Sequence, residues 1–91
     1  MISVLSNVLP RQTVELCDKF FAGDVAGAAK MQCDMLELIN ALFCEVNPIP
    51  AKAAVAALGF CEDYLRLPLV PMSDGNRQRL YAAMRANGLE V

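Results

Sequence analysis

Histidine is absent from this chain, which limits the kinds of catalytic site and metal site that the chain can form. Histidine is the most common general base and a common zinc ligand, so an acid–base site would need other groups and the mixed Cys/His zinc patterns are excluded. The cysteines at positions 17, 33, 44 and 61 are separated by 16, 11 and 17 residues, and none forms a C-x-x-C pair. We therefore predict four free, mostly buried thiols, no metal and no cofactor.

Excess positive charge and long apolar runs are also missing. Eight basic and ten acidic residues give a net charge of −2 and a pI near 4.9, so the basic face of a nucleic-acid binder is not expected. No stretch approaches the roughly 20 apolar residues of a membrane span. Residues 1–9 are apolar but have neither a charged leader region nor a cleavage site. These features predict a cytoplasmic protein without nucleic-acid or membrane partners.

Apolar residues are abundant. They make up 56% of the 91 residues, against about 45–50% in an ordinary domain, and much of the excess is alanine. Alanine suits tightly packed helices. The remaining excess is consistent with a surface that is covered by a partner in the native assembly.

The order of elements predicted from the pattern is one strand followed by four helices. Residues 1–6 are short and β-branched, which predicts a strand, although a single strand cannot complete its own hydrogen bonds. Pro10 then opens a helix over residues 10–22, with Val14, Cys17 and Phe21 on one face and Leu16 and Phe20 beside them, and Gly23 and Asp24 make a minimal turn. The helix from 25 to 46 has two adjacent apolar rows, so several neighbours should contact it. The first row is Val25, Ala29, Leu36, Ile39, Phe43 and Val46; the second is Ala28, Met31, Met35, Leu38 and Leu42.

The segment Glu45-Val46-Asn47-Pro48-Ile49-Pro50-Ala51-Lys52 predicts a joint between two helices. Two prolines stop the first helix, while Asn47 is a suitable N-cap for the next and Pro48 suits a first helical position. A short alanine-rich helix over residues 48–58 should end at Gly59. An extended strap over residues 60–72 should follow, and then a helix that starts at Ser73 and stops at Gly88.

Residue spacing does not assemble a catalytic site. No serine lies in a nucleophile motif, and the glycines form no phosphate-binding cluster. Lys52 is the only lysine in a structured motif and is therefore the candidate to examine as a Schiff-base amine. Such an amine needs a desolvated pocket, whereas Lys52 is predicted in the first turn of a helix, where a surface role is favoured.

The chain resembles the C-terminal third of the dihydrodipicolinate synthase family, over essentially its whole length. Four motifs in the same order support the resemblance. They are Phe43-x-Glu45-x-Asn47-Pro48-Ile49-Pro50-x-Lys52, Leu58-Gly59, Arg66-Leu67-Pro68-x-x-Pro71 and Asn87-Gly88-Leu89. Ala53 departs from the bulky aromatic residue of many relatives, which leaves the local packing open.

The resemblance implies a mainly α fold: a helical bundle preceded by one β-strand, forming the C-terminal end of a (β/α)8 barrel enzyme. Residues 1–22 would be the last strand and helix of the barrel, and residues 23–91 a C-terminal helical domain. The family condenses pyruvate with aspartate semialdehyde in lysine and diaminopimelate biosynthesis. Its Schiff-base lysine on the sixth strand, and the tyrosine, threonine and arginine that assist it, would precede residue 1. The resemblance thus implies a C-terminal fragment that is inactive alone, has the N-terminal barrel portion as partner and belongs to a homo-oligomer.

The resemblance also points to three positions at the border of the substrate pocket. Ile2 matches a residue whose backbone carbonyl lies beside the Schiff-base lysine, and Asn47 with Pro48 matches the joint at the active-site mouth. For Asn47, the structural role of a helix N-cap is preferred over a role in the substrate pocket. Two alternatives stay open. The first is a sister pyruvate aldolase such as N-acetylneuraminate lyase, although the Asn-Pro-Ile-Pro joint favours the synthase. The second is a free-standing helical interaction module.

Overall fold

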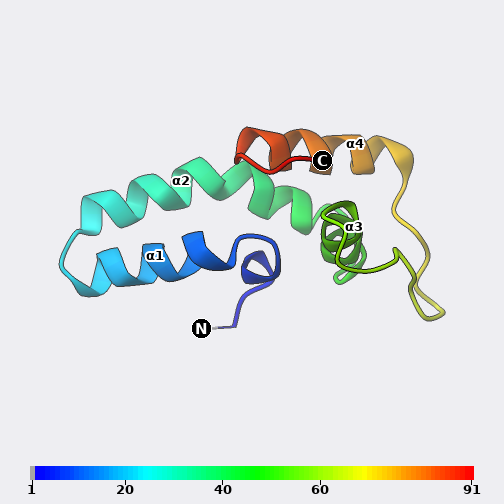
Figure 1. Cartoon of the computed structure of the whole chain (residues 1–91), viewed down its shortest axis with the longest axis horizontal. Helices are drawn as coiled ribbons and strands as arrows, with labels where there is room; N and C mark the ends of the chain where they lie inside the picture. The colour runs from blue at the N-terminus through cyan, green and yellow to red at the C-terminus, as the bar shows by residue number, and fades with distance from the viewer. Residues whose placement is uncertain (1) are drawn as a thin grey trace.

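The computed structural model describes residues 2–91, which form an elongated bundle of about 44 × 23 × 21 Å (Figure 1). In order, the elements are the short 3-10 helix η1 (Leu5–Asn7) and the α-helices α1 (Pro10–Phe21), α2 (Val25–Leu42), α3 (Ile49–Ala57) and α4 (Asp74–Ala86). Helices α1 and α2 make an antiparallel hairpin along the long axis, and α4 lies along the C-terminal half of α2. None of the helices in residues 2–91 is long and apolar enough to cross a membrane.

The strand predicted over residues 1–6 is not present in the described residues 2–6, and Met1 lies outside the described part of the chain. The backbone instead turns into η1. The Ser6 amide donates to Ser3 Oγ at 3.1 Å, and the Val8 amide donates to the Leu5 carbonyl at 2.9 Å. The physical reason is that residues 2–91 offer no second strand, so these polar groups are satisfied locally. The helical part of the predicted fold is confirmed, and residues 2–6 form no strand in this structure.

The predicted turn between the first two helices is confirmed. Pro10 opens α1, and Gly23 has the positive φ of +91° that a helix-ending residue requires. Asp24 caps α2, because its Oδ1 accepts a hydrogen bond from the Gly27 amide at 2.9 Å.

Helix α2 ends at Leu42, four residues before the predicted end. Phe43 has left the helical conformation (φ −119°, ψ 10°), and the Phe43 and Cys44 amides donate to carbonyls three residues back, those of Asn40 at 3.2 Å and Ala41 at 3.4 Å. Pro48 and Pro50 then have no amide hydrogen to donate to the carbonyls of residues 44 and 46, so the helix does not continue through them. Residues 43–48 form a turning segment.

Only one of the two apolar rows on α2 faces the core. Ala28, Met35, Leu38 and Leu42 of the second row are buried, and α1, α3 and α4 all contact this helix, which confirms the prediction of several neighbours. The first row stays largely open to solvent, with Leu36 47% and Phe43 56% exposed. We call Val25, Leu36, Phe43 and Val46 the uncovered row.

Of the apolar residues noted on helix α1, only some face the core. Val14 and Phe21 are 59% and 83% exposed, while Thr13 is buried and Leu16 packs against the core. The Thr13 hydroxyl is accommodated because it donates to the Leu9 carbonyl at 2.8 Å. Val14 and Phe21 therefore add to the apolar surface of the α1–α2 hairpin.

The second half of the chain follows the prediction more closely. Ala51, Ala53 and Ala54 are buried where α3 meets α4, since small side chains allow two helices to approach closely. Ala53, which stands where many relatives have a bulky aromatic residue, is accommodated here as one of these small buried side chains. Residues 60–72 form no regular helix or strand, as expected for the strap, and Gly59 and Gly88 have positive φ at the predicted stops.

Truncation of Leu38 should destabilise the chain far more than truncation of Leu36, two residues away on the same helix. Leu38 is 0% exposed, so Leu38→Ala leaves a cavity and should lower the free energy of unfolding by about 2–5 kcal/mol. Leu36→Ala is the matched control and should cost less than about 1 kcal/mol. Urea unfolding followed by circular dichroism measures both. Equal losses would contradict the assignment of the inner and outer rows.

Candidate functional site

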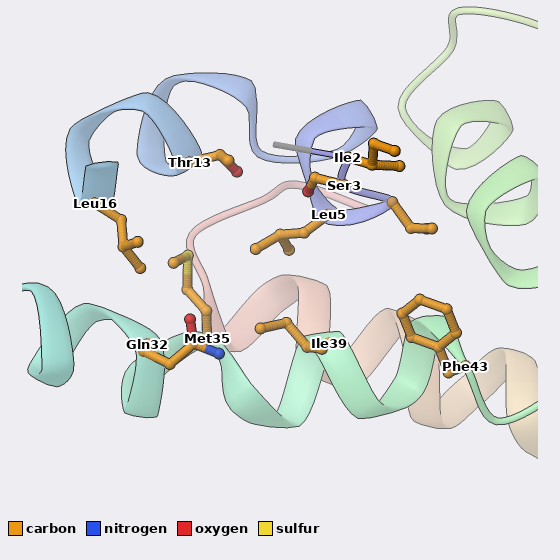
Figure 2. Close-up of a pocket in the computed structure, with 10 residues that line it drawn as sticks. Ile2, Ser3, Leu5, Thr13, Leu16, Gln32, Met35, Ile39 and Phe43 are labelled. Atoms are coloured by element: carbon orange, nitrogen blue, oxygen red, sulfur yellow. The ribbon is translucent and has the colours of Figure 1, made fainter. Parts of the chain in front are cut away.

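The first cavity, of about 220 Å³, lies between the N-terminal segment, α1 and α2 (Figure 2). Leu5, Leu16, Met35 and Ile39 point into it, and Ile2 lies at its edge. The hydroxyl of Thr13, which also lines it, is already hydrogen-bonded to the backbone. Ser3 and Gln32 add a hydroxyl and an amide to the lining, so the cavity is mainly apolar with a few polar groups.

The second cavity, of about 260 Å³, is a shallow hollow beside the joint. Pro48, Lys52 and Cys61 line it together with Asn7, Ala51 and Val55. Asn7 ends the short η1 helix, whereas Pro48 precedes α3, so this hollow brings the N-terminal segment next to the joint.

The predicted border residues do not share one cavity. Ile2 lines the first cavity and Pro48 the second, and Asn47 lines neither. Asn47 is also not the N-cap of α3: the helix starts at Ile49, which makes Pro48 the N-cap, and no side chain in this described segment caps it. The prediction of an Asn47 cap is wrong because the helix begins one residue later than the proline pattern suggested.

Lys52 lies near the start of α3, as predicted. Its side chain is partly buried at the edge of the open second cavity. An enclosed pocket, which would desolvate the ammonium group, is what a Schiff-base lysine needs. The position favours the surface role given to Lys52 from the sequence.

The cysteines are free thiols at four separate places. Cys17 and Cys44 are partly buried, whereas Cys33 and Cys61 are exposed, so the prediction of mostly buried thiols is wrong. Cys33 lies on the outer side of α2 and Cys61 follows the end of α3, where neither has a neighbour to cover it. Among residues 2–91 there is no cluster of three or more possible metal-ligating side chains.

A polar cluster around Glu45 was not anticipated from the sequence. Its Oε2 accepts three hydrogen bonds: from the Ser73 amide at 3.1 Å, the Ser73 hydroxyl at 2.9 Å and the Asn76 side-chain amide at 2.9 Å. Ser73 is the N-cap residue of α4, as predicted, but its hydroxyl donates to Glu45 instead of capping its own helix. The hydrogen bonds from Asn76 and Ser73 lower the pKa of Glu45. Because the partners of Glu45 lie 28 and 31 residues away in the sequence, no local sequence pattern could have revealed this cluster.

Arg77 forms a second tie at the start of α4. Its guanidinium lies 2.9 Å from the Asp63 carboxylate of the strap and also donates to the Met72 carbonyl at 3.2 Å. The hydrogen bonds to Tyr81 and Asp63 raise the pKa of Arg77. Both side chains of the ion pair are largely buried, so the pair is less screened than one at the surface.

Comparison with known proteins gives one consistent family. A sequence model described as the dihydrodipicolinate synthetase family matches residues 1–87. The 4-hydroxy-tetrahydrodipicolinate synthase of Geobacter sulfurreducens is 47% identical over 85 residues, which cover 93% of this chain and 29% of that protein.

Solved structures agree with the sequence matches. A monomeric dihydrodipicolinate synthase variant superimposes with a TM-score of 0.96 at 44% identity, covering 99% of this chain and 30% of that one. The dihydrodipicolinate synthase of Thermotoga maritima gives a TM-score of 0.95, also at 44% identity, over 97% of this chain and 30% of the other. The chain thus spans about 30% of the length of the proteins it matches.

The hydrogen bonds to Glu45 should make part of the stability depend on pH. Because the folded-state pKa of Glu45 lies below its ordinary value of 4.5, its contribution is present above that value and is lost as the pH falls through the folded pKa. Glu45→Gln should therefore lower the free energy of unfolding near neutral pH and flatten its decline in acid. Denaturant unfolding at about pH 7 and about pH 3 measures this. Glu37→Gln, an exposed carboxyl on α2, is the control, and an equal flattening in it would contradict the role of Glu45.

Proposed function

The chain belongs to the dihydrodipicolinate synthetase family, and we propose that it is the C-terminal region of a dihydrodipicolinate synthase. Residues 1–22 supply the last strand and helix of a (β/α)8 barrel, and residues 23–91 the helical domain that follows. The enzyme condenses pyruvate with aspartate semialdehyde on the route to diaminopimelate and lysine. The observation that supports this most strongly is the superposition on a family member with a TM-score of 0.96 at 44% identity over 99% of the chain.

The exposed apolar surface supports a missing partner. The uncovered row of α2, together with Val14 and Phe21 of α1, leaves the hairpin with large apolar side chains in contact with water. Burial of apolar surface contributes about 25 cal/mol per Å², so a partner that covers these side chains would be strongly favoured. We assign this surface to contact with the N-terminal barrel portion.

The N-terminal segment is suited to the same assembly. Ile2, Val4 and Leu5 are apolar, and the segment turns into η1 at Leu5 where no neighbouring strand is present among residues 2–91. Next to a seventh strand and a first strand they would form the eighth. Asn7 would then stand at the C-terminal end of that strand, which is the face where barrel enzymes place their active sites.

The second cavity supports one of the three border residues. Pro48 lines it together with Asn7, so the joint lies beside the end of the proposed strand. We propose from the family resemblance that the Ile2 carbonyl and Asn47 also border the substrate pocket in the assembled barrel. The Schiff-base lysine comes from the preceding part of the enzyme, and we propose that the chain alone is inactive.

Other parts of the proposal rest on the family alone. We place the enzyme in the cytoplasm, where its free thiols stay reduced, and we propose a homo-oligomer that needs no cofactor. A free-standing helical interaction module would use the same uncovered row as its docking face. A sister aldolase, such as N-acetylneuraminate lyase, would differ in the substrate that reacts with the assembled barrel.

Synthase activity should appear only when the chain is combined with the barrel portion. The chain is co-expressed with the N-terminal two-thirds of a relative, and the consumption of pyruvate with aspartate semialdehyde is measured. We expect activity for the pair and none for either part. Phe43→Glu should reduce it, because a carboxylate would have to be buried in the apolar contact.

The control is the relative's own C-terminal segment with the same barrel portion. If that pair is active and the pair with this chain is not, the proposed function is wrong. Pairing that cleaves N-acetylneuraminate instead would favour the sister aldolase. Sedimentation of an active complex gives its oligomeric state, and a single copy of each part would contradict the homo-oligomer.

Pyruvate and borohydride should leave the mass of the isolated chain unchanged. A Schiff-base lysine needs an enclosed, desolvated pocket, whereas Lys52 lies at the edge of an open hollow. Intact-mass spectrometry after reduction measures the adduct, with the full-length relative as the positive control. A stoichiometric adduct at Lys52 would overturn the assignment of roles.

A further inference from the structure

Residues 43–48 have few hydrogen bonds of their own. The Phe43 and Cys44 amides donate to the Asn40 and Ala41 carbonyls at 3.2 and 3.4 Å, the Ile49 amide donates to the Val46 carbonyl at 2.9 Å, and the Pro48 carbonyl accepts from the Lys52 amide at 2.8 Å. Phe43, Val46 and Asn47 are exposed. Cys44 packs against the core, and the three hydrogen bonds of Glu45 are the side-chain hydrogen bonds that this described segment makes.

The first turn of α4 is where three distant segments meet. Ser73 and Asn76 donate to Glu45 of the joint, and Arg77 pairs with Asp63 of the strap. A carboxylate is also favoured at this place because the N-terminus of a helix carries partial positive charge. Glu45 thus adds a second carboxylate to the one that Asp74 already places in the first turn.

We propose that Glu45 is a positioning residue that fixes the joint on the N-terminus of α4, so that α4 determines where Pro48 and the second cavity lie. A change at Ser73 or Asn76 then moves a segment 28 to 31 residues away along the chain. The importance of this position for the substrate pocket rests on the proposed function. The contact between Glu45 and α4 does not rest on the proposed function, and it can be tested in this chain by itself.

Cys44 provides a natural reporter of the joint. It is partly buried next to Glu45, and Cys17 is a partly buried thiol on α1 that serves as the internal control. The rate of labelling by N-ethylmaleimide is measured at each cysteine by peptide mass spectrometry. Substitution of Glu45 would remove the carboxylate next to the thiol, which by itself favours labelling, so the decisive variants are those on α4, where an added carboxylate acts in the opposite direction.

Asn76→Ala removes a donor to Glu45 and should speed the labelling of Cys44 by about three- to tenfold, with Cys17 unchanged. Gln78→Ala, an exposed residue on the same helix, is the matched control and should change neither rate. Ser73→Ala removes the second side-chain donor, and combining it with Asn76→Ala should increase the rate further.

Asn76→Asp separates positioning from helix stability. An aspartate in the first turn favours α4 through the helix dipole, but it repels the carboxylate of Glu45. If Glu45 positions the joint, Cys44 in Asn76→Asp is labelled faster than in Asn76→Ala. If the cluster only stabilises α4, labelling stays at the rate of the unchanged chain, and the proposal is overturned.

Two further outcomes would overturn the proposal. One is an equal rise at Cys17 and Cys44 in Asn76→Ala, which indicates general loosening of the bundle. The other is an unchanged rate at Cys44 in the Ser73→Ala and Asn76→Ala variants at unchanged helical content. Neither result depends on enzyme activity, so the positioning role and the proposed synthase function can fail independently.

Discussion

The inner row of α2 is the contact on which the rest of the bundle depends. Met35, Leu38 and Leu42 are buried, and α1, α3 and α4 are all arranged around this one helix. The helices other than α2 are at most 13 residues long, and helices of that length are marginal in water without tertiary packing. Burial of this row therefore organises the entire bundle.

The same helix also accounts for much of the exposed apolar surface. Its uncovered row is apolar, and the N-terminal segment folds locally into η1. Both features fit the proposed assembly, in which a barrel sheet and its helices would supply contacts that the described residues do not make.

The joint between α2 and α3 is organised by polar contacts instead of packing. Prolines stop the helix, but they do not specify where the chain goes next. Glu45 supplies that information by binding the first turn of α4, and the Arg77–Asp63 pair brings the strap to the same place. Residues that border the second cavity thereby come under the influence of a helix much later in the sequence.

Local chemistry in the sequence determined the helix ends, whereas tertiary structure decided which faces and charges are used. Pro10, Asp24, Gly59 and Gly88 act within one turn of the chain, so the sequence predicted their roles. The family, too, could be identified from the ordered motifs alone. The inward face of α1, the choice between the two rows of α2 and the strand that did not form depend on which neighbours are present, and a local pattern does not contain that information. The partners of Glu45 were unpredictable for the same reason: they lie 28 and 31 residues away and meet it only after the helices pack.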